Sequence, residues 1–266
     1  MAQAILEPLI RNNKINPEDI FAVVGSKNSI SRFDSSVFEG IDLVASDEPR
    51  AAEVWHTSTQ LLAVKPQQIE KIESSFKSAQ LKGFSIPPLL ISILAGVRLE
   101  RLKVIFKNHS LVRAVPNTPC LVGSGLTGLS WGTGITKKER VLVKDIFSPI
   151  SEIFELPEKQ LDAFLALTSS GPAYVALITE ALADGAVAAG LPRNLAGELA
   201  NKTLLGSSLL LKNRNMHPAL LKDMVASPGG TTIKALRHLE KARVRSALIE
   251  AVVLAAEKSL EISQKV

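Results

Sequence analysis

The chain has very little cysteine and few aromatic residues. Of its 266 residues one is cysteine, and Phe, Trp and Tyr together make up 5%. A single thiol excludes an internal disulfide and is typical of a reducing compartment, so we expect a cytoplasmic protein. Cys120 follows a proline in an apolar context, which favours a small buried side chain over a nucleophile. Because hydrophobic residues still reach 46%, Ala, Leu, Val and Ile must build the core.

Long apolar runs and a concentrated charge are also missing. The longest apolar run, residues 86–97, contains two prolines and Ser92 and is too short to cross a bilayer. The first residues lack the basic flank and apolar stretch of a signal peptide. The net charge of +5 is spread among acidic residues, without a basic stripe interleaved with stacking aromatics. We therefore expect neither a membrane nor a nucleic-acid partner, and the His and Cys spacings predict no metal site.

The first half of the chain alternates short apolar runs with helical segments. This alternation predicts a parallel sheet with helices on both faces, which binds ligands at the carboxyl ends of its strands. We expect helices over residues 1–11 and 67–81, and strands over residues 20–25, 41–45, 61–64, 89–95 and 111–115.

Helical periodicity replaces the strand pattern after about residue 137. Helices are expected over residues 137–154, 161–189 with an interruption near Gly171 and Pro172, 194–212 and 244–262. The segment 161–189 is apolar around much of its circumference, and such helices need cover on several sides. A bundle this small favours a partner subunit as part of that cover.

Residues 223–240 contain a candidate anion pocket made of backbone. Ser227 suits an N-cap and Pro228 the first helical position, so a helix is expected to begin here with free amides. Gly229 and Gly230 let a ligand approach the backbone closely. A carboxylate would meet N–H donors and the positive end of the helix dipole, beside the hydroxyl of Thr232. The alternative is a plain capped turn between two helices.

The same stretch, from residue 225 to 240, resembles the signature of pyrroline-5-carboxylate reductases. Further stretches resemble this family in the family's order: 63–66, 115–119, 170–174, 181–185, 190–192 and 217–218. The resemblance implies NAD(P)H-dependent reduction of 1-pyrroline-5-carboxylate to L-proline, the last step of proline biosynthesis. It also implies an α/β Rossmann-like dinucleotide-binding domain, expected at residues 1–156. An all-α dimerisation and substrate domain, expected at residues 157–266, would join subunits as a homodimer or a higher assembly of dimers.

The expected dinucleotide-binding domain departs from the family at its start. Residues 1–5 resemble the end of the Gly-rich turn and the beginning of the helix that carries the pyrophosphate. The first strand and the glycines of that turn are missing. We interpret Met1 as an internal methionine of a longer reading frame, or as a trimmed start, rather than as a true loss.

Several residues are predicted to bind the coenzyme. Ser26 and Lys27 follow a strand where an NAD site would carry an acid, and they favour NADPH, with NADH as the alternative donor; an ordinary polar loop is the other interpretation. The remaining candidates resemble family loops near the ribose and nicotinamide: Ala63, Val64, Lys65, Pro66, Leu94, Ala95, Gly96, Asn117, Thr118 and Ser170. Lys65 could be only a surface cation, Asn117 and Thr118 a rigid turn, and Ser170 only the mark of a helix distortion.

The implied chemistry demands little from the protein beyond positioning, because a protonated imine is already a good electrophile. The substrate carboxylate is assigned to Ser227, Gly229, Gly230, Thr231 and Thr232, and the ring nitrogen to the Thr232 hydroxyl. Two alternatives remain open. A related hydroxyacid dehydrogenase should carry a catalytic Lys on its interdomain helix, yet residues 161–184 contain none. A non-catalytic dimeric remnant would explain the missing glycines.

Overall fold

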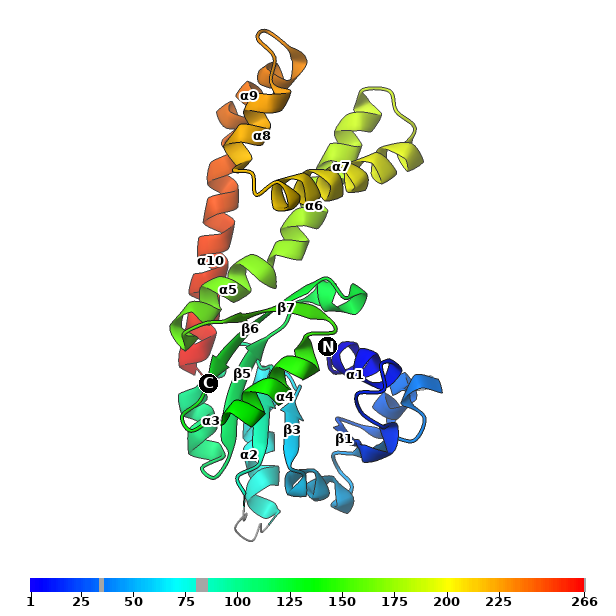
Figure 1. Cartoon of the computed structure of the whole chain (residues 1–266), viewed down its shortest axis with the longest axis vertical. Helices are drawn as coiled ribbons and strands as arrows, with labels where there is room; N and C mark the ends of the chain where they lie inside the picture. Colours follow the sequence, from blue (N-terminus) through cyan, green and yellow to red (C-terminus); the bar gives the residue numbers. More distant parts are fainter. Residues whose placement is uncertain (34–35, 80–85, 266) are drawn as a thin grey trace. The chain divides into compact units, whose positions relative to one another are not determined.

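The computed structural model describes residues 1–33, 36–79 and 86–265 (Figure 1). The chain divides into two compact units. Unit 1 comprises Met1–Ser169 together with Ala256–Val266, and unit 2 comprises Ser170–Ala255. The domain limits expected from the sequence, at residues 156 and 157, stay a prediction.

Unit 1 contains two sheets. The strands β1 (Phe21–Val24) and β2 (Asp42–Ala45) form a parallel pair. Five strands form the second sheet in the order β3-β4-β5-β6-β7: β3 (Thr59–Leu62), β4 (Leu89–Ser92), β5 (Ser110–Val115), β6 (Gly125–Trp131) and β7 (Ser151–Glu155). The adjacent strands of this sheet pair in parallel, except that β5 and β6 are antiparallel. The sheet is therefore mixed rather than purely parallel.

The five expected strands are present, but two further strands were not predicted. The helix expected over residues 137–154 begins as predicted but ends early: α4 (Lys137–Phe147) ends before Pro149, and β7 follows it. Proline lacks the N–H and the conformational freedom to continue a helix, so Ser148 and Pro149 end it. The sequence pattern does not indicate β6 because Gly125 and Gly128 interrupt its apolar run, and glycine is unfavourable in strands.

Helices cover both faces of the larger sheet, as expected. Leu89 and Ile91 of β4 join a core with residues of α1 (Ala2–Arg11) and α4, whereas Leu90 joins a second core with residues of α2 (Ile69–Ser78) and α3 (Leu99–Ile105). Successive strand side chains point to opposite faces, so a run of apolar residues serves both cores. The end of the expected helix 67–81 falls partly on residues 80 and 81, which lie outside the described residues.

The helix α5 (Leu161–Thr168) completes the α/β unit, and unit 2 is helical. Its elements are α6 (Gly171–Ala188), α7 (Arg193–Asn213), α8 (Pro218–Val225), α9 (Thr231–Lys241) and the first part of α10 (Val244–Lys265). The predicted interruption is confirmed, because α5 ends at Thr168 and α6 begins at Gly171 with Pro172 in its first turn. α8 was not predicted.

The helices of unit 2 expose many apolar side chains in a single copy of the chain. α6 and α7 pack on each other through Ala183, Ala196 and Ala200, with few other buried residues. Large side chains that are 40% exposed or more include Val175, Leu177, Leu182, Leu199, Leu205, Leu209, Leu220, Val253 and Leu254. By length and composition, the stretch Glu158–Ala188 is also long and apolar enough to cross a membrane. It contains two helices, α5 and α6, with a break between Thr168 and Gly171.

Candidate active site

Three predicted coenzyme loops begin at one edge of the larger sheet. Leu62 at the end of β3 is in register with Ser92 at the end of β4, and Ser92 is in register with Arg113 near the end of β5. These strands are parallel, so the loops after them emerge at the same edge. The ends of parallel strands are where open α/β sheets bind ligands.

The first loop, residues 63–66, has a fixed backbone and an exposed cation. Lys65 donates its N–H to Gln68 Oε1 at 3.2 Å, and its carbonyl accepts the N–H of Gln68 at 2.9 Å. Val64 is half-buried against the second core, whereas the Lys65 side chain is exposed. This loop therefore presents an ammonium group on a rigid turn.

The second loop, residues 94–96, offers one exposed residue between two buried ones. Leu94 is 1% exposed and belongs to the second core, Gly96 is buried, and Ala95 is exposed. Gly96 has φ +75°, a conformation that glycine adopts without strain. A Cβ at this position would lie 2.7 Å from Cγ2 of Ile262, so the glycine is also required by close packing.

In the third loop, the Asn117 side chain is engaged by protein groups. Asn117 is 4% exposed; its Nδ2 donates to the carbonyl of Thr168 at 2.9 Å, and its Oδ1 accepts the N–H of Leu126 at 2.8 Å. The side chain thus ties the end of α5 to the start of β6. Thr118 is exposed. A rigid turn at Asn117 is present, and contact of this loop with a nicotinamide stays a prediction.

Ser170, the last of the predicted coenzyme residues in the chain, is half-buried and is the N-cap residue of α6. The preceding residue, Ser169, has a buried hydroxyl with no hydrogen-bond partner in the part of the chain that the structure describes.

Ser26 and Lys27 follow β1 and are exposed. Ser26 Oγ lies 3.1 Å from Ser29 Oγ, and Lys27 begins a 3₁₀ turn, Lys27–Phe33. The carbonyl of Gly25 accepts a hydrogen bond from Ser46 Oγ at 3.1 Å, which joins this loop to the one after β2. A hydroxyl and an ammonium group at the end of a parallel strand suit a phosphate better than a neutral ribose.

The turn before α9 differs from the sequence prediction. The N-cap residue of α9 is Gly230 and the first helical residue is Thr231, so Ser227 as N-cap and Pro228 as first helical residue are wrong. Residues 227–230 instead form a tight turn, closed by the Gly230 N–H donating to the Ser227 carbonyl at 3.0 Å. Pro228 occupies the second position of this turn, and Gly229 has the positive φ, +69°, that its third position requires.

This correction moves the N-cap of α9 by three residues, from Ser227 to Gly230, and leaves the candidate anion pocket at the same residues. No side chain of the described residues caps the N-terminus of α9, and its first turn contains no acidic residue. The amides of Thr231 and Thr232 are therefore free N–H groups at the positive end of the dipole of an eleven-residue helix. A Cβ on Gly230 would overlap the Ser227 hydroxyl, so the turn needs a glycine there. Thr232 is half-buried, and its hydroxyl has no hydrogen-bond partner among the described residues.

A further glycine pattern lies at residues 123–128, reading Gly-Ser-Gly-Leu-Thr-Gly. Its spacing is that of a dinucleotide-binding turn, which lies between a strand and a helix. Here the pattern runs into β6, which pairs antiparallel to β5. A Cβ at Gly125 would overlap Cys120 Sγ, and one at Gly128 would lie 2.9 Å from Leu161 Cδ2. These two glycines permit close packing and do not form a phosphate cradle.

The N-terminus of α1 offers backbone amides instead. Met1 is the N-cap residue, no side chain in the described part of the chain caps the helix, and its first turn contains no acid. α1 contacts the 3₁₀ turn Thr118–Val122, which follows β5. α1 therefore lies beside the last of the three predicted coenzyme loops. Among the described residues, no group of three or more His, Cys, Asp and Glu side chains could hold a metal ion.

Three comparisons with known proteins identify the same family. A family model described as pyrroline-5-carboxylate reductase dimerisation matches residues 158–262. The pyrroline-5-carboxylate reductase of a Synechocystis strain is 43% identical over 266 residues, which cover 100% of this chain and 96% of that protein. The Arabidopsis thaliana reductase is 38% identical, with 99% and 92% covered. The structure of Plasmodium falciparum pyrroline carboxylate reductase with NADP bound has a TM-score of 0.84 at 30% identity, with 98% and 94% covered.

Fold and comparisons together define a Rossmann-like α/β oxidoreductase with a helical C-terminal dimerisation domain. Within that class, the chain belongs to the pyrroline-5-carboxylate reductase family, whose members are NAD(P)H-dependent oxidoreductases. The resemblance seen in residues 225–240 and in the shorter stretches is confirmed.

Proposed function

We propose that this chain reduces 1-pyrroline-5-carboxylate to L-proline with a hydride from NADPH. The observation that carries the proposal is its identity of 43% to a curated reductase across 100% of its length. The individual site residues are part of the proposal. A non-catalytic remnant and a hydroxyacid dehydrogenase are the competing functions.

The substrate carboxylate is assigned to the turn before α9. Gly229 and Gly230 bring bare backbone to the surface, and the amides of Thr231 and Thr232 are uncapped at the start of the helix. Anions bind well at such a position because the N–H groups and the helix dipole act together. Ser227 shapes the turn through its carbonyl and can add its exposed hydroxyl.

Thr232 is assigned to the imine nitrogen of the substrate. Its hydroxyl has no partner among the described residues, so it is available to a ligand without breaking an internal hydrogen bond. The hydroxyl can accept a hydrogen bond from the protonated imine and hold the ring in one orientation. After reduction the same group faces the amine of proline. Thr232 thus contributes orientation rather than acid or base strength.

The residues at the sheet edge fit a nicotinamide dinucleotide. Lys65, Ala95 and Thr118 are the exposed residues of three loops from adjacent strand ends, and the same loops contain the other predicted residues Ala63, Val64, Pro66, Leu94 and Gly96. The first-turn amides of α1 suit the pyrophosphate. We assign Asn117 as a positioning residue, and Ser170 to the neighbourhood of the nicotinamide.

When bound, the reduced coenzyme supplies the hydride. The substrate imine is protonated on nitrogen, and its carbon receives the hydride, so that the C=N double bond becomes the C–N single bond of proline. The chain needs to bind and orient the substrate and the coenzyme and to exclude water from them. No side chain has to act as a metal ligand or nucleophile. The electron balance closes with one hydride and one proton for each proline formed.

The preference for NADPH over NADH is proposed from Ser26 and Lys27. The Plasmodium falciparum relative is described with NADP bound, which supports an NAD(P) coenzyme here. An exposed hydroxyl and an exposed ammonium group favour the additional phosphate of NADPH electrostatically.

The protein is proposed to work as a homodimer or as an assembly of dimers. Residues 158–262 match a dimerisation domain, and the apolar side chains exposed on α6, α7 and α10 need cover. A second copy provides matching apolar surface, so we propose no membrane partner for Glu158–Ala188. A cytoplasmic location is proposed from the single cysteine, which is buried and free.

A direct assay tests the proposed function. The purified chain is mixed with NADPH and 1-pyrroline-5-carboxylate, while loss of NADPH absorbance and formation of proline are followed together. We expect equal amounts of NADPH consumed and proline formed. A folded, oligomeric protein that forms no proline with either coenzyme would favour the remnant, and turnover of a hydroxyacid in place of the imine would favour the dehydrogenase.

A further inference from the structure

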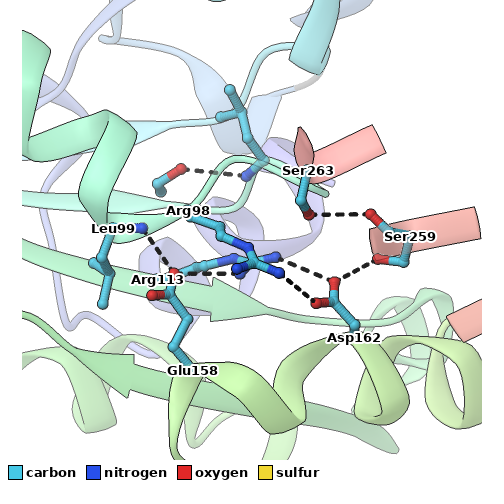
Figure 2. Close-up of polar contacts among 9 residues, drawn as sticks. Arg98, Leu99, Arg113, Glu158, Asp162, Ser259 and Ser263 are labelled. Atoms are coloured by element: carbon cyan, nitrogen blue, oxygen red, sulfur yellow. Dashed lines mark hydrogen bonds and ion pairs between the residues drawn. The ribbon is translucent and has the colours of Figure 1, made fainter. Parts of the chain in front are cut away.

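An ionic cluster surrounds the buried Arg113 of β5 (Figure 2). Arg113 in β5 is fully buried, and its guanidinium Nη1 lies 3.3 Å from Glu158 Oε1, while Nη2 lies 3.9 Å from Asp162 Oδ1. Arg98 Nη2 lies 3.7 Å from Asp162 Oδ2. A buried charge requires partners of this kind, because an unpaired one is strongly destabilising. An arginine in the middle of an apolar strand is the sequence signal that could have identified this cluster.

The last turns of α10 are attached to the same cluster. Ser259 is buried, and its hydroxyl donates to Asp162 Oδ1 at 2.7 Å, although the two residues are 97 positions apart. One turn later, Ser263 Oγ donates to the carbonyl of Ser259 at 3.0 Å (Figure 2). The carboxylate of Asp162 thus links β5 to the end of α10.

These turns of α10 also contact the loop of residues 94–96. Ile262 and Ser263 approach Gly96 so closely that a Cβ there would lie 2.7 Å from Ile262 Cγ2 and 3.4 Å from the Ser263 nitrogen. On the other side, the Leu99 N–H donates to Glu158 Oε1 at 2.7 Å. The backbone from Gly96 to Leu99 is therefore held between the end of α10 and the acidic residues of the cluster.

We propose that the end of α10, through Ser259 and Ile262, is a positioning element that fixes the loop 94–96 for coenzyme binding. This inference rests on the proposed function, which assigns that loop to NADPH. The loop follows β4 without secondary structure of its own, and Gly96 gives it additional conformational freedom. Ordering such a loop upon binding costs conformational entropy, so packing that orders it beforehand improves affinity.

Two pairs of variants test the proposal in the intact chain. Ile262→Ala removes the γ-carbons that pack on Gly96, whereas Ile262→Val keeps Cβ and Cγ2 and is the matched control. Ser259→Ala removes the hydrogen bond to Asp162, whereas Lys258→Ala changes an exposed residue of the same turn. The dissociation constant of NADPH is measured by nicotinamide fluorescence, and the thermal midpoint is measured in parallel.

We expect Ile262→Ala and Ser259→Ala to raise the NADPH dissociation constant about fivefold or more, and the two controls to change it less than about twofold. At saturating NADPH the KM for pyrroline carboxylate should stay unchanged, because the substrate turn is not altered. Hydrogen exchange of the loop amides should be faster in the two alanine variants than in their controls. Folded alanine variants with unchanged NADPH affinity and unchanged loop exchange would overturn the inference.

The same measurements distinguish failure of the proposed function from failure of the proposed role of α10. A wild-type chain that does not bind NADPH would refute the proposed function and this inference with it. A wild-type chain that binds NADPH and forms proline, beside alanine variants that behave like their controls, would refute this inference alone.

Discussion

Substitution of Thr232 by Val separates a ligand-binding hydroxyl from a structural one. Thr232 lies in the first turn of α9, is half-buried, and donates to no group among the described residues. Val has nearly the same volume and branching, so the folded state loses no internal hydrogen bond. We expect the free energy of unfolding to change by less than about 0.5 kcal/mol, as for ordinary surface substitutions.

The effect on the reaction should be much larger. Loss of a positioned hydrogen bond to the imine nitrogen is worth about 1–3 kcal/mol, which corresponds to roughly a ten- to hundredfold lower turnover number. The backbone amides that hold the carboxylate are retained, so the KM for pyrroline carboxylate should change less than kcat. Steady-state kinetics with saturating NADPH measure both values.

Thr232→Ser is the matched control, because it keeps the hydroxyl and loses only the methyl group. It should retain most of the turnover that Thr232→Val loses. If both variants keep wild-type kcat and KM, Thr232 does not orient the substrate, and the turn 227–232 is only a connection between α8 and α9.

The remaining predictions concern stability, coenzyme choice and assembly. Burial lowers the pKa of His109 to about 4 from 6.5, so the folded state favours the neutral ring. The free energy of unfolding should therefore be highest above about pH 6.5 and should fall by up to about 3 kcal/mol as the pH falls through 4. Urea unfolding over this range measures the loss, and a His109→Gln variant with an unchanged pH slope would contradict this cause. Ser26→Asp should raise the dissociation constant of NADPH by about tenfold and narrow or reverse the preference over NADH, because the carboxylate repels the additional phosphate; an unaltered ratio in competitive titrations would remove Ser26 from the site. Light scattering at micromolar concentration should give at least twice the monomer mass of 28.6 kDa with or without mild detergent, whereas a stable monomer would refute the oligomer.

Much of the fold followed from local sequence patterns. The strands β1 to β5 are short apolar runs bounded by polar or breaking residues, and each was recognised from that pattern. The Gly171 and Pro172 pair likewise predicted the interruption between α5 and α6. These features depend on residues close together in the chain, which is why the sequence reveals them.

The features that escaped prediction depend on tertiary packing or on turn chemistry. β6 contains glycines that leave room for the side chains of Cys120 and Leu161. A strand pattern in the sequence does not show these tertiary contacts. Pro149 is a sequence signal for the early end of the expected helix 137–154, because proline cannot continue a helix.

At the candidate site, the residue types were recognised, but their local roles were not all correct. Ser227 and Gly230 both suit an N-cap, and the hydrogen bond between them closes a turn that leaves Gly230 as the N-cap of α9. The link between Asp162 and Ser259 joins residues 97 positions apart, and one sequence contains no signal for such a pair.

Transfer of deuterium tests the central claim most directly. NADPH carrying deuterium at one or the other face of nicotinamide C4 is supplied separately with 1-pyrroline-5-carboxylate, and the proline formed is examined by mass spectrometry and NMR. The claim of direct hydride transfer to the imine carbon predicts that the label from one face, and not from the other, appears at the ring δ carbon of proline. Unlabelled proline from both preparations, or no proline at all from a folded oligomer, would contradict it.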